Sequence, residues 1–155
     1  MIIWMVQKID LIVGGPPCQA YSLIGRARDE NGMLGDKRNY LYKLYGEFLK
    51  KYRPKYFVFE NVTGLLSAKD TDEKLHFDKM RGFYFQQCGY KTEYKTLNAA
   101  DYGVLQNRKR IILIGKYGDG EKFYPEIPKI ERTYFVGEIF KDLPFYGLEA
   151  EVQDL

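Results

Sequence analysis

A cysteine, a carboxylate and a pair of arginines are the residues of this chain whose types and positions could do chemistry together. Cys18 follows the run Gly14-Gly15-Pro16-Pro17, in which glycine permits unusual backbone angles and each proline fixes φ. Such a loop is stiff, so it would present the Cys18 thiol as a nucleophile after the apolar strand expected over residues 9–13. The alternative for Cys18 taken alone is a buried structural thiol, a common fate of free cysteine.

Glu60 and two arginines occupy comparable positions on later elements. Glu60 follows the apolar run 56–59, and a basic segment holding Arg108 and Arg110 leads into the apolar run 111–115. A thiol, a carboxylate and guanidinium groups are therefore expected at strand ends of one sheet, where open α/β sheets bind their ligands. Taken singly, the Glu60 segment is a weak signal, and a basic run is most often a solvated face.

The hydrophobic pattern predicts the elements that would position these groups. Strands are expected over residues 9–13, 56–59, 90–97 and 111–115, and helices over residues 38–52, 71–88 and 136–141. Arg53-Pro54 should stop the first helix, Asp70 and Glu73 predict a capping box at the start of the second, and Gly89 should end it. The alternation predicts an α/β layered fold with one long, basic loop, residues 20–37.

Composition and charge exclude several classes of protein. The 155 residues suffice for one domain, and a net charge of +3 is compatible with nucleic-acid binding without arguing for it. The two cysteines and the single histidine lack metal-ligand spacing, so neither a zinc site nor a disulfide framework is predicted, and the thiols fit a reducing cytoplasm. No apolar run approaches the roughly 20 residues that span a bilayer, and no signal peptide is predicted.

The motifs taken together resemble those of the cytosine-5 DNA methyltransferases. Residues 14–19 are similar to the family's nucleophile motif, residues 60–62 to its Glu-Asn-Val motif, and residues 97–110 to its arginine motif. Residues 135–144 are similar to the family segment that leads towards a target-recognition domain. The resemblance covers about residues 9 to 115, and the combination of motifs in this order is far more specific than any one of them.

The resemblance implies a fold and a division of the chain. The fold would be α/β, the C-terminal half of a partial doubly wound, Rossmann-like sheet of the kind that binds S-adenosylmethionine. Residues 1–115 would form a partial catalytic domain, and residues 116–155 a connector towards a missing target-recognition domain. The family's Gly-rich cofactor loop has no counterpart here, so the chain is expected to be a cloned fragment, the product of a truncated gene or one part of a split enzyme.

The resemblance also implies a reaction, DNA methylation of the kind found in restriction–modification systems. The Cys18 thiolate would add to carbon 6 of a cytosine flipped out of duplex DNA, and carbon 5 would then take a methyl group from S-adenosylmethionine. Glu60 would act as a general acid at ring N3, Arg110 would bind near O2, and cations such as Arg108 would favour the thiolate. The implied residues are Cys18, Glu60, Arg108 and Arg110 for catalysis, Pro17 and Leu41 for the cofactor, and Gln19, Ser22, Arg26 and Asn61 for DNA.

The behaviour of the isolated chain follows from the same resemblance. It should have little or no activity alone, and an open sheet edge should invite self-association or pairing with a complementing methyltransferase fragment. The expected location is the cytoplasm of a bacterial or phage-infected cell, at the nucleoid. Two alternatives remain open: an RNA cytosine-5 methyltransferase of the same fold, and a non-catalytic module that binds nucleic acid by charge.

Overall fold

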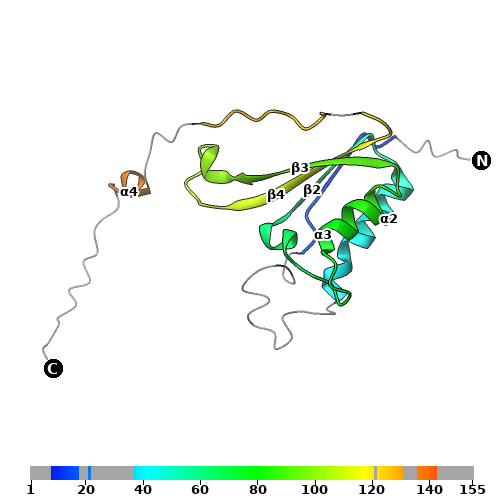
Figure 1. The fold of residues 1–155 in the computed structure, drawn as a ribbon. Coiled ribbons are helices and arrows are strands. Elements are labelled where there is room, and N and C mark those ends of the chain that lie inside the picture. The colour runs from blue at the N-terminus through cyan, green and yellow to red at the C-terminus, as the bar shows by residue number, and fades with distance from the viewer. Residues whose placement is uncertain (1–7, 18–20, 22–36, 121, 131–135, 143–155) are drawn as a thin grey trace, which may run out of the picture.

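One four-stranded sheet forms the frame of the chain (Figure 1). The computed structural model describes residues 8–17, 21, 37–120, 122–130 and 136–142. The strand order is β1-β2-β4-β3; β1 and β2 are parallel, and β4 is antiparallel to both of its neighbours. The strands are β1 (Leu11–Gly14), β2 (Tyr56–Val62), β3 (Tyr90–Asn98) and β4 (Lys109–Tyr117). The predicted α/β fold is confirmed, and each predicted strand is present with shifted ends.

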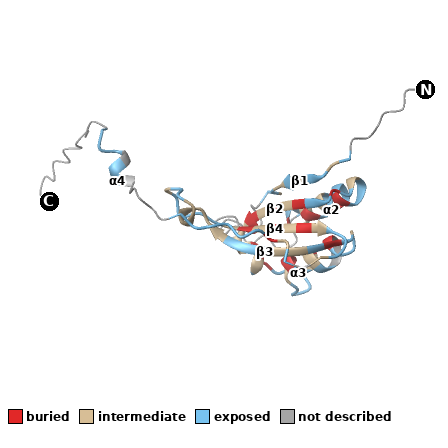
Figure 2. Cartoon of the chain, turned by 90° about the horizontal axis from the view of Figure 1, so that it is seen from above, coloured by how far each residue is buried: buried red, intermediate tan, exposed pale blue. Residues whose placement is uncertain are grey.

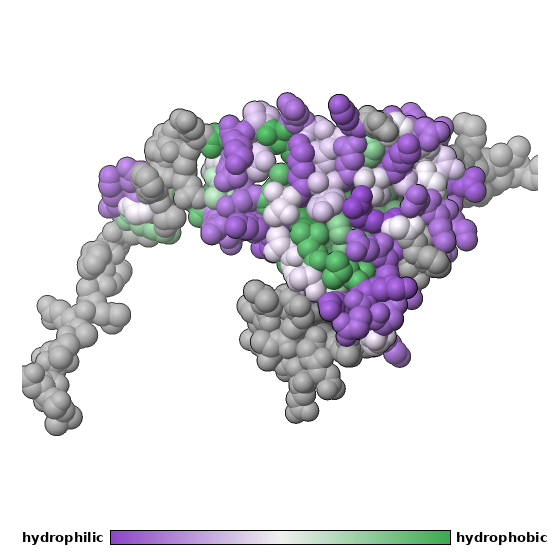
Figure 3. Space-filling model, in the orientation of Figure 1, coloured by the Kyte–Doolittle hydropathy of each residue, from purple (hydrophilic) through white to green (hydrophobic). Residues whose placement is uncertain are grey.

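Helical segments cover one face of this sheet (Figure 1). They are α2 (Leu41–Tyr52), α3 (His76–Asp78) and η3 (Lys79–Phe85). The core lies between them, because alternate residues of the central strands, such as Phe57 and Phe59 of β2, point to the helices and are fully buried. Figure 3 shows hydrophilic residues over most of the visible surface and an apolar area below the sheet, on the side of the helices.

Helix α2 fastens the two parallel strands to each other. Its residue Tyr45 reaches the sheet, where the hydroxyl lies 2.9 Å from the Val58 carbonyl oxygen of β2 and 3.3 Å from the Ile12 carbonyl oxygen of β1. The helix ends as predicted, because Arg53 adopts a left-handed conformation (φ 44°), and its N–H donates to the Leu49 carbonyl oxygen. A short 3-10 turn, η1 (Lys37–Tyr40), leads into α2 and replaces the first turn of the predicted helix.

The second predicted helix, over residues 71–88, is wrong at its start. Residues 70–74 form a closed turn in which the Asp70 N–H donates to the Lys74 carbonyl oxygen and Glu73 has a left-handed φ of 64°. Glu73 pairs with Lys69 at 2.8 Å instead of capping a helix, so the helical residues begin only at His76. Most of the following turns are π-helical, and Gly89 ends the segment with a φ of 87°, as predicted.

The first strand pairs in parallel with β2, and it is not buried. It forms one edge of the sheet (Figure 2), and its side chains that point away from the helices are open, with Leu11 51% and Val13 67% exposed. Continuous apolar sequence is typical of parallel strands covered on both faces. Among the described residues, helices cover only one face of β1, and only one of its two edges pairs with another strand.

The tail is partly integrated with the sheet. Strand β4 continues to Tyr117, past the predicted boundary after residue 115, and the Glu93 carboxylate of β3 accepts the N–H groups of Phe123 and Tyr124. The predicted short helix is present as α4 (Val136–Ile139). None of the described helices is long and apolar enough to cross a membrane. The role of the tail as a connector stays a prediction.

Gly115 carries a test of the packing between the sheet and the helices. It lies opposite Phe57, and a Cβ atom built on it would overlap the Phe57 ring. We expect Gly115→Ala to lower the free energy of unfolding by about 1–3 kcal/mol, because the buried ring has to move. Urea unfolding measures this, with Gly82→Ala as the control, since a Cβ at Gly82 meets nothing within 4 Å. An equal stability of the two variants would contradict the packing.

Candidate active site

The loop that leads to Cys18 is held by the end of β2. Asn61 is 1% exposed, and its side-chain amide donates to the Pro16 carbonyl oxygen at 3.2 Å. The Asn61 side-chain oxygen accepts the N–H of Val62 at 2.9 Å, which fixes the orientation of the amide. A buried amide with both ends satisfied is a stable tether, because breaking it would leave polar atoms unpaired.

Glu60 and Arg110 form an ion pair on the opposite face of the sheet from Asn61. The antiparallel register places Glu60 opposite Ile112, so Arg110, two residues earlier on β4, is its diagonal neighbour on the same face. The Arg110 Nε atom lies 2.8 Å from Oε1 of Glu60. Both side chains remain partly exposed, and the Arg110 Nη1 atom also donates to the Lys109 carbonyl oxygen at 2.8 Å.

The carboxylate of Glu60 also lies against the loop before Cys18. A Cβ atom on Gly15 would come within 2.8 Å of Oε2 of Glu60 and 3.3 Å of its main-chain oxygen. Glycine at this position is therefore required for the close approach. The structure thus gathers the Gly-Gly-Pro-Pro loop, Glu60 and Arg110 at one end of the sheet, as the positions of these motifs predict.

The other predicted site residues fall into two groups. Cys18, Gln19, Ser22 and Arg26 lie outside the described residues. Pro17 is exposed, Leu41 is the half-buried first residue of α2, and Arg108 is exposed while its carbonyl oxygen accepts the N–H of Ala99.

Asn61 differs from its predicted role. The resemblance implies a DNA contact, but the side chain is buried and its amide is engaged with Pro16 and Val62. The geometry therefore supports a function for Asn61 in holding the loop. The adjacent Glu60 and Asn61 point to opposite faces because successive strand residues alternate, so one can face a ligand while the other holds the protein.

Tyr45 and Gly15 contribute to the site and are missed by the sequence analysis. Tyr45 lies on the apolar stripe of α2, where an aromatic residue at helical spacing indicates only a core position. Nothing in that pattern shows that its hydroxyl reaches two strands. Gly15 is part of the stiff loop in the sequence analysis, and only the position of Glu60 shows why a side chain is excluded there.

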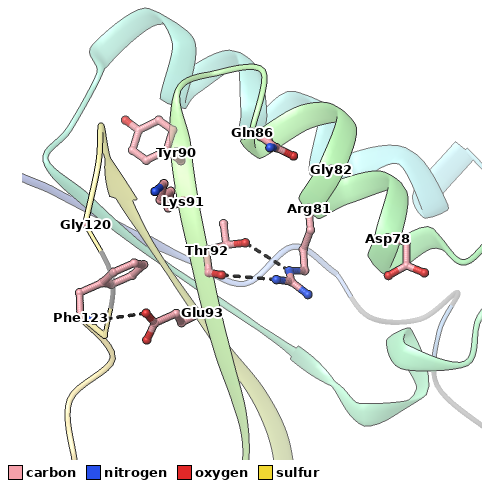
Figure 4. Close-up of a pocket in the computed structure, with 10 residues that line it drawn as sticks. All are labelled: Asp78, Arg81, Gly82, Gln86, Tyr90, Lys91, Thr92, Glu93, Gly120 and Phe123. Carbon is pink, nitrogen blue, oxygen red and sulfur yellow. Dashed lines mark hydrogen bonds between the residues drawn. The ribbon is translucent and has the colours of Figure 1, made fainter.

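A separate cavity lies at the Tyr90 end of β3, away from the Glu60–Arg110 pair (Figure 4). It has a volume of about 470 Å³ and is bounded by η3, β3 and the segment near Phe123. Arg81 lies on its wall and donates to the Thr92 hydroxyl and carbonyl oxygens. The register pairs Tyr90 with Tyr117 but Leu97 with Arg110, so this cavity is separated from the Glu60–Arg110 pair by the length of the strand. Among the described residues, no group of three His, Cys, Asp or Glu side chains could hold a metal ion.

Known type II methyltransferases are similar in sequence to most of this chain. Type II methyltransferase M.XorII of Xanthomonas oryzae pv. oryzae is 44% identical over 141 residues, which are 89% of this chain and 30% of that enzyme. Type II methyltransferase M.Bpa9945I of Bacillus paralicheniformis is 41% identical over 129 residues, 81% of this chain and 28% of that enzyme. The chain thus spans less than a third of the length of either relative.

Solved structures of other proteins have a fold similar to that of this chain. A prophage-encoded E. coli protein assigned as a DNA modification methyltransferase matches with a TM-score of 0.60 and 25% identity, over 89% of this chain and 36% of the other. Entamoeba histolytica methyltransferase EhMeth matches with a TM-score of 0.55 and 19% identity, over 80% of this chain and 37% of the other. The sequence profile described as C-5 cytosine-specific DNA methylase matches residues 4–144. With its motifs gathered at one end of a methyltransferase sheet, the chain belongs to the C-5 cytosine-specific DNA methylase family.

Proposed function

We propose that the protein containing this chain methylates carbon 5 of cytosine in DNA, with Cys18 as the nucleophile. The observation that carries the proposal is the Glu60–Arg110 pair, which lies against Gly15 in the loop that ends at Cys18. A carboxyl group and a guanidinium held at the loop that leads to Cys18 fit the chemistry of a pyrimidine ring, which needs a proton donor at N3 and a cation near O2.

The reaction begins with a bond between sulfur and carbon. The Cys18 thiolate adds to carbon 6, and the ring electrons move towards N3 and O2, so carbon 5 becomes nucleophilic. A proton shared between the Glu60 carboxyl group and N3 stabilises the charge there, while Arg110 balances the charge near O2. After carbon 5 has been alkylated, loss of its proton expels the thiolate and restores the aromatic ring. The base must leave the duplex for this attack. The resemblance to the family implies that Gln19, Ser22 and Arg26 contact the DNA.

The methyl donor of the family is S-adenosylmethionine, which supplies an activated methyl group when bound. Among the described residues, exposed Pro17 and half-buried Leu41 offer only apolar contacts. A cofactor with a ribose and an amino-acid group needs polar partners as well, so these two residues do not make a complete site. Our mechanism therefore concerns only the activation of cytosine by the side chains of this chain. The proposed place of action is the cytoplasm of a bacterial or phage-infected cell, at its DNA.

The RNA alternative uses the same chemistry, and the non-catalytic alternative uses only charge. The relatives named as type II methyltransferases favour DNA. The Glu60–Arg110 pair lies close to Gly15, where a larger residue would contact the Glu60 carboxylate. This close approach favours catalysis over binding by charge alone, because attraction to a charged backbone does not need it.

The edge of β1 supports a proposal about assembly. The opposite edge strand, β3, is protected, because the Arg81 side chain donates to its Thr92 carbonyl oxygen. On β1, no described residue pairs with the outer edge, and Leu11 and Val13 are exposed. Natural sheets rarely leave an apolar edge open, so we infer that β1 pairs with another strand, from a complementing methyltransferase fragment or, in the isolated chain, from a second copy.

Covalent trapping tests the nucleophile. Duplex DNA carrying 5-fluorocytosine, incubated with S-adenosylmethionine and the protein as its host produces it, should form a stable adduct. After methyl transfer, carbon 5 carries fluorine in place of the proton whose loss would expel the thiolate. We expect Cys18→Ala to abolish the adduct, and Cys88→Ala to retain it, because Cys88 is a half-buried thiol whose pKa is raised by burial. Denaturing gels with mass spectrometry measure the adduct. If Cys18→Ala traps as well as the parent protein, the assignment fails; preferential trapping on 5-fluorocytosine RNA would favour the alternative substrate.

Substitution of Gly15 tests the role of Glu60. In Gly15→Ala the new methyl group should displace the Glu60 carboxylate, so trapping should slow by about 10–100-fold, as expected when a general acid is displaced. The fold should change little, because the end of a flexible side chain can move away. Gly82→Ala is the matched control, with open space at its Cβ. Equal trapping rates for the two variants would contradict the proposed role of the carboxylate.

The association state tests the proposal about β1. We expect the isolated chain to self-associate as its concentration rises, and Val13→Lys to shift it towards monomer, because a charged side chain on an edge strand prevents pairing. Val104→Lys is the control, since Val104 is also exposed but lies outside the strands. Sedimentation velocity measures both. A chain that stays monomeric at high concentration would contradict self-association.

A further inference from the structure

His76 lies in a buried aromatic cluster that the proposed chemistry does not use. Its side chain is 1% exposed, and three tyrosine rings present their edges or faces to it: Tyr21 at 5.5 Å, Tyr40 at 5.7 Å and Tyr42 at 6.4 Å between ring centroids. Interplanar angles of 60° to 70° are typical of favourable edge-to-face contacts. Burial lowers the pKa of His76 below its ordinary value of 6.5, so the imidazole is neutral at physiological pH.

The three tyrosines come from both sides of the long loop of the sequence. Tyr21 is three residues after Cys18, while Tyr40 and Tyr42 follow the loop, in η1 and α2. Tyr21 also donates its hydroxyl proton to the Asn39 carbonyl oxygen, so the two sides are joined directly as well. His76 therefore lies where the chain before residue 22 and the chain after residue 36 come together.

A buried carboxylate holds this cluster in place. Asp70 accepts from the Tyr40 hydroxyl at 2.6 Å and from the Lys79 ammonium at 2.7 Å, and the N–H of Thr71 adds a third hydrogen bond at 2.7 Å. These contacts hold the pKa of Asp70 well below its usual range, so the carboxylate stays charged. Tyr40 is thus fixed at its hydroxyl end, and its ring has a defined position against His76.

The position of Cys18 in the chain connects this cluster to the chemistry. On one side of Cys18, the Pro16 carbonyl oxygen is held by Asn61; on the other side, Tyr21 is buried against His76. Only three residues, 18–20, separate Pro17 from Tyr21, and the four Cα–Cα steps between these two residues span at most about 14 Å when extended. Fixing both ends of a short segment restricts the positions open to its cysteine.

We propose that His76 is a positioning residue: its ring fixes Tyr21 against Tyr40 and Tyr42, and thereby sets where Cys18 is presented to the base. The inference rests on the proposed function of Cys18. We expect His76 to act through packing, because its ring contacts are with the three tyrosines and its buried Nδ1 atom has no hydrogen-bond partner among the described residues. A phenylalanine should therefore replace it well, whereas an alanine should not.

Three variants of the full chain separate positioning from general stability. His76→Ala removes the ring, and His76→Phe keeps an aromatic edge. Phe77→Ala is the matched control, because Phe77 is the adjacent buried ring but contacts Tyr94 at 4.7 Å and not the tyrosine cluster. All three are compared at a temperature where circular dichroism shows them folded.

Hydrogen exchange tests whether the ring holds the chain. In His76→Ala, peptides that contain Tyr21 and residues 39–42 should exchange at least about tenfold faster, because local opening becomes easier. His76→Phe should exchange like the parent chain, and Phe77→Ala should change the peptides of α3 and β3 instead. Unchanged exchange in His76→Ala, or the same pattern in Phe77→Ala, would overturn the proposal.

Trapping with 5-fluorocytosine DNA and S-adenosylmethionine tests whether the ring positions Cys18, and it is done on the protein as its host produces it, because the isolated chain is expected to have little or no activity. At saturating DNA, His76→Ala should trap about tenfold more slowly with an unchanged half-saturating DNA concentration, and His76→Phe should restore the rate. Faster exchange with an unchanged trapping rate would show that the cluster holds the chain without positioning the thiol, which overturns the inference. A parent protein that forms no adduct defeats the proposed function of Cys18, and with it the positioning claim, whatever the exchange result.

Discussion

The register between β2 and β4 is the constraint on which the site depends. Side chains alternate along a strand, so a slip of one residue would move Arg110 to the face opposite Glu60 and break their pair. The packing fixes this register, because Phe57 lies over Gly115 and a side chain at that point would overlap its ring. A glycine in the core, far along the strand from the ion pair, therefore helps decide which charges meet.

The parallel pairing of β1 with β2 brings the cysteine loop to the same end of the sheet. Two side chains hold this arrangement from the face that the helices cover. The hydroxyl of Tyr45 in α2 lies near carbonyl oxygens of both strands, and the amide of Asn61 binds the Pro16 carbonyl oxygen. Both bind main-chain oxygens, so they fix the backbone of the two strands and of the loop. The loop is thus positioned by the helical side of the sheet, while Glu60 and Arg110 act from the other.

The same alternation explains the unequal surfaces of the sheet. Residues of one parity face α2, α3 and η3 and are buried, and residues of the other parity form a face that carries both the ion pair and exposed apolar side chains such as Val13. The open edge of β1 has a separate cause, because no described strand pairs with its outer side.

The sequence by itself determined the α/β fold, the order of its strands along the chain, the helix ends at Arg53 and Gly89, and the family motifs. These follow from local hydrophobic periodicity and from glycine and proline geometry, which need no distant partner. The start of the second helix did not follow, because Asp70 binds Tyr40 and Lys79, which are 30 and 9 residues away, and so cannot cap it. Only the tertiary structure decided that β1 is an exposed edge, that Asn61 holds the loop before Cys18, and that His76 contacts tyrosines from both sides of the long loop. Each of these depends on contacts between residues far apart in the chain.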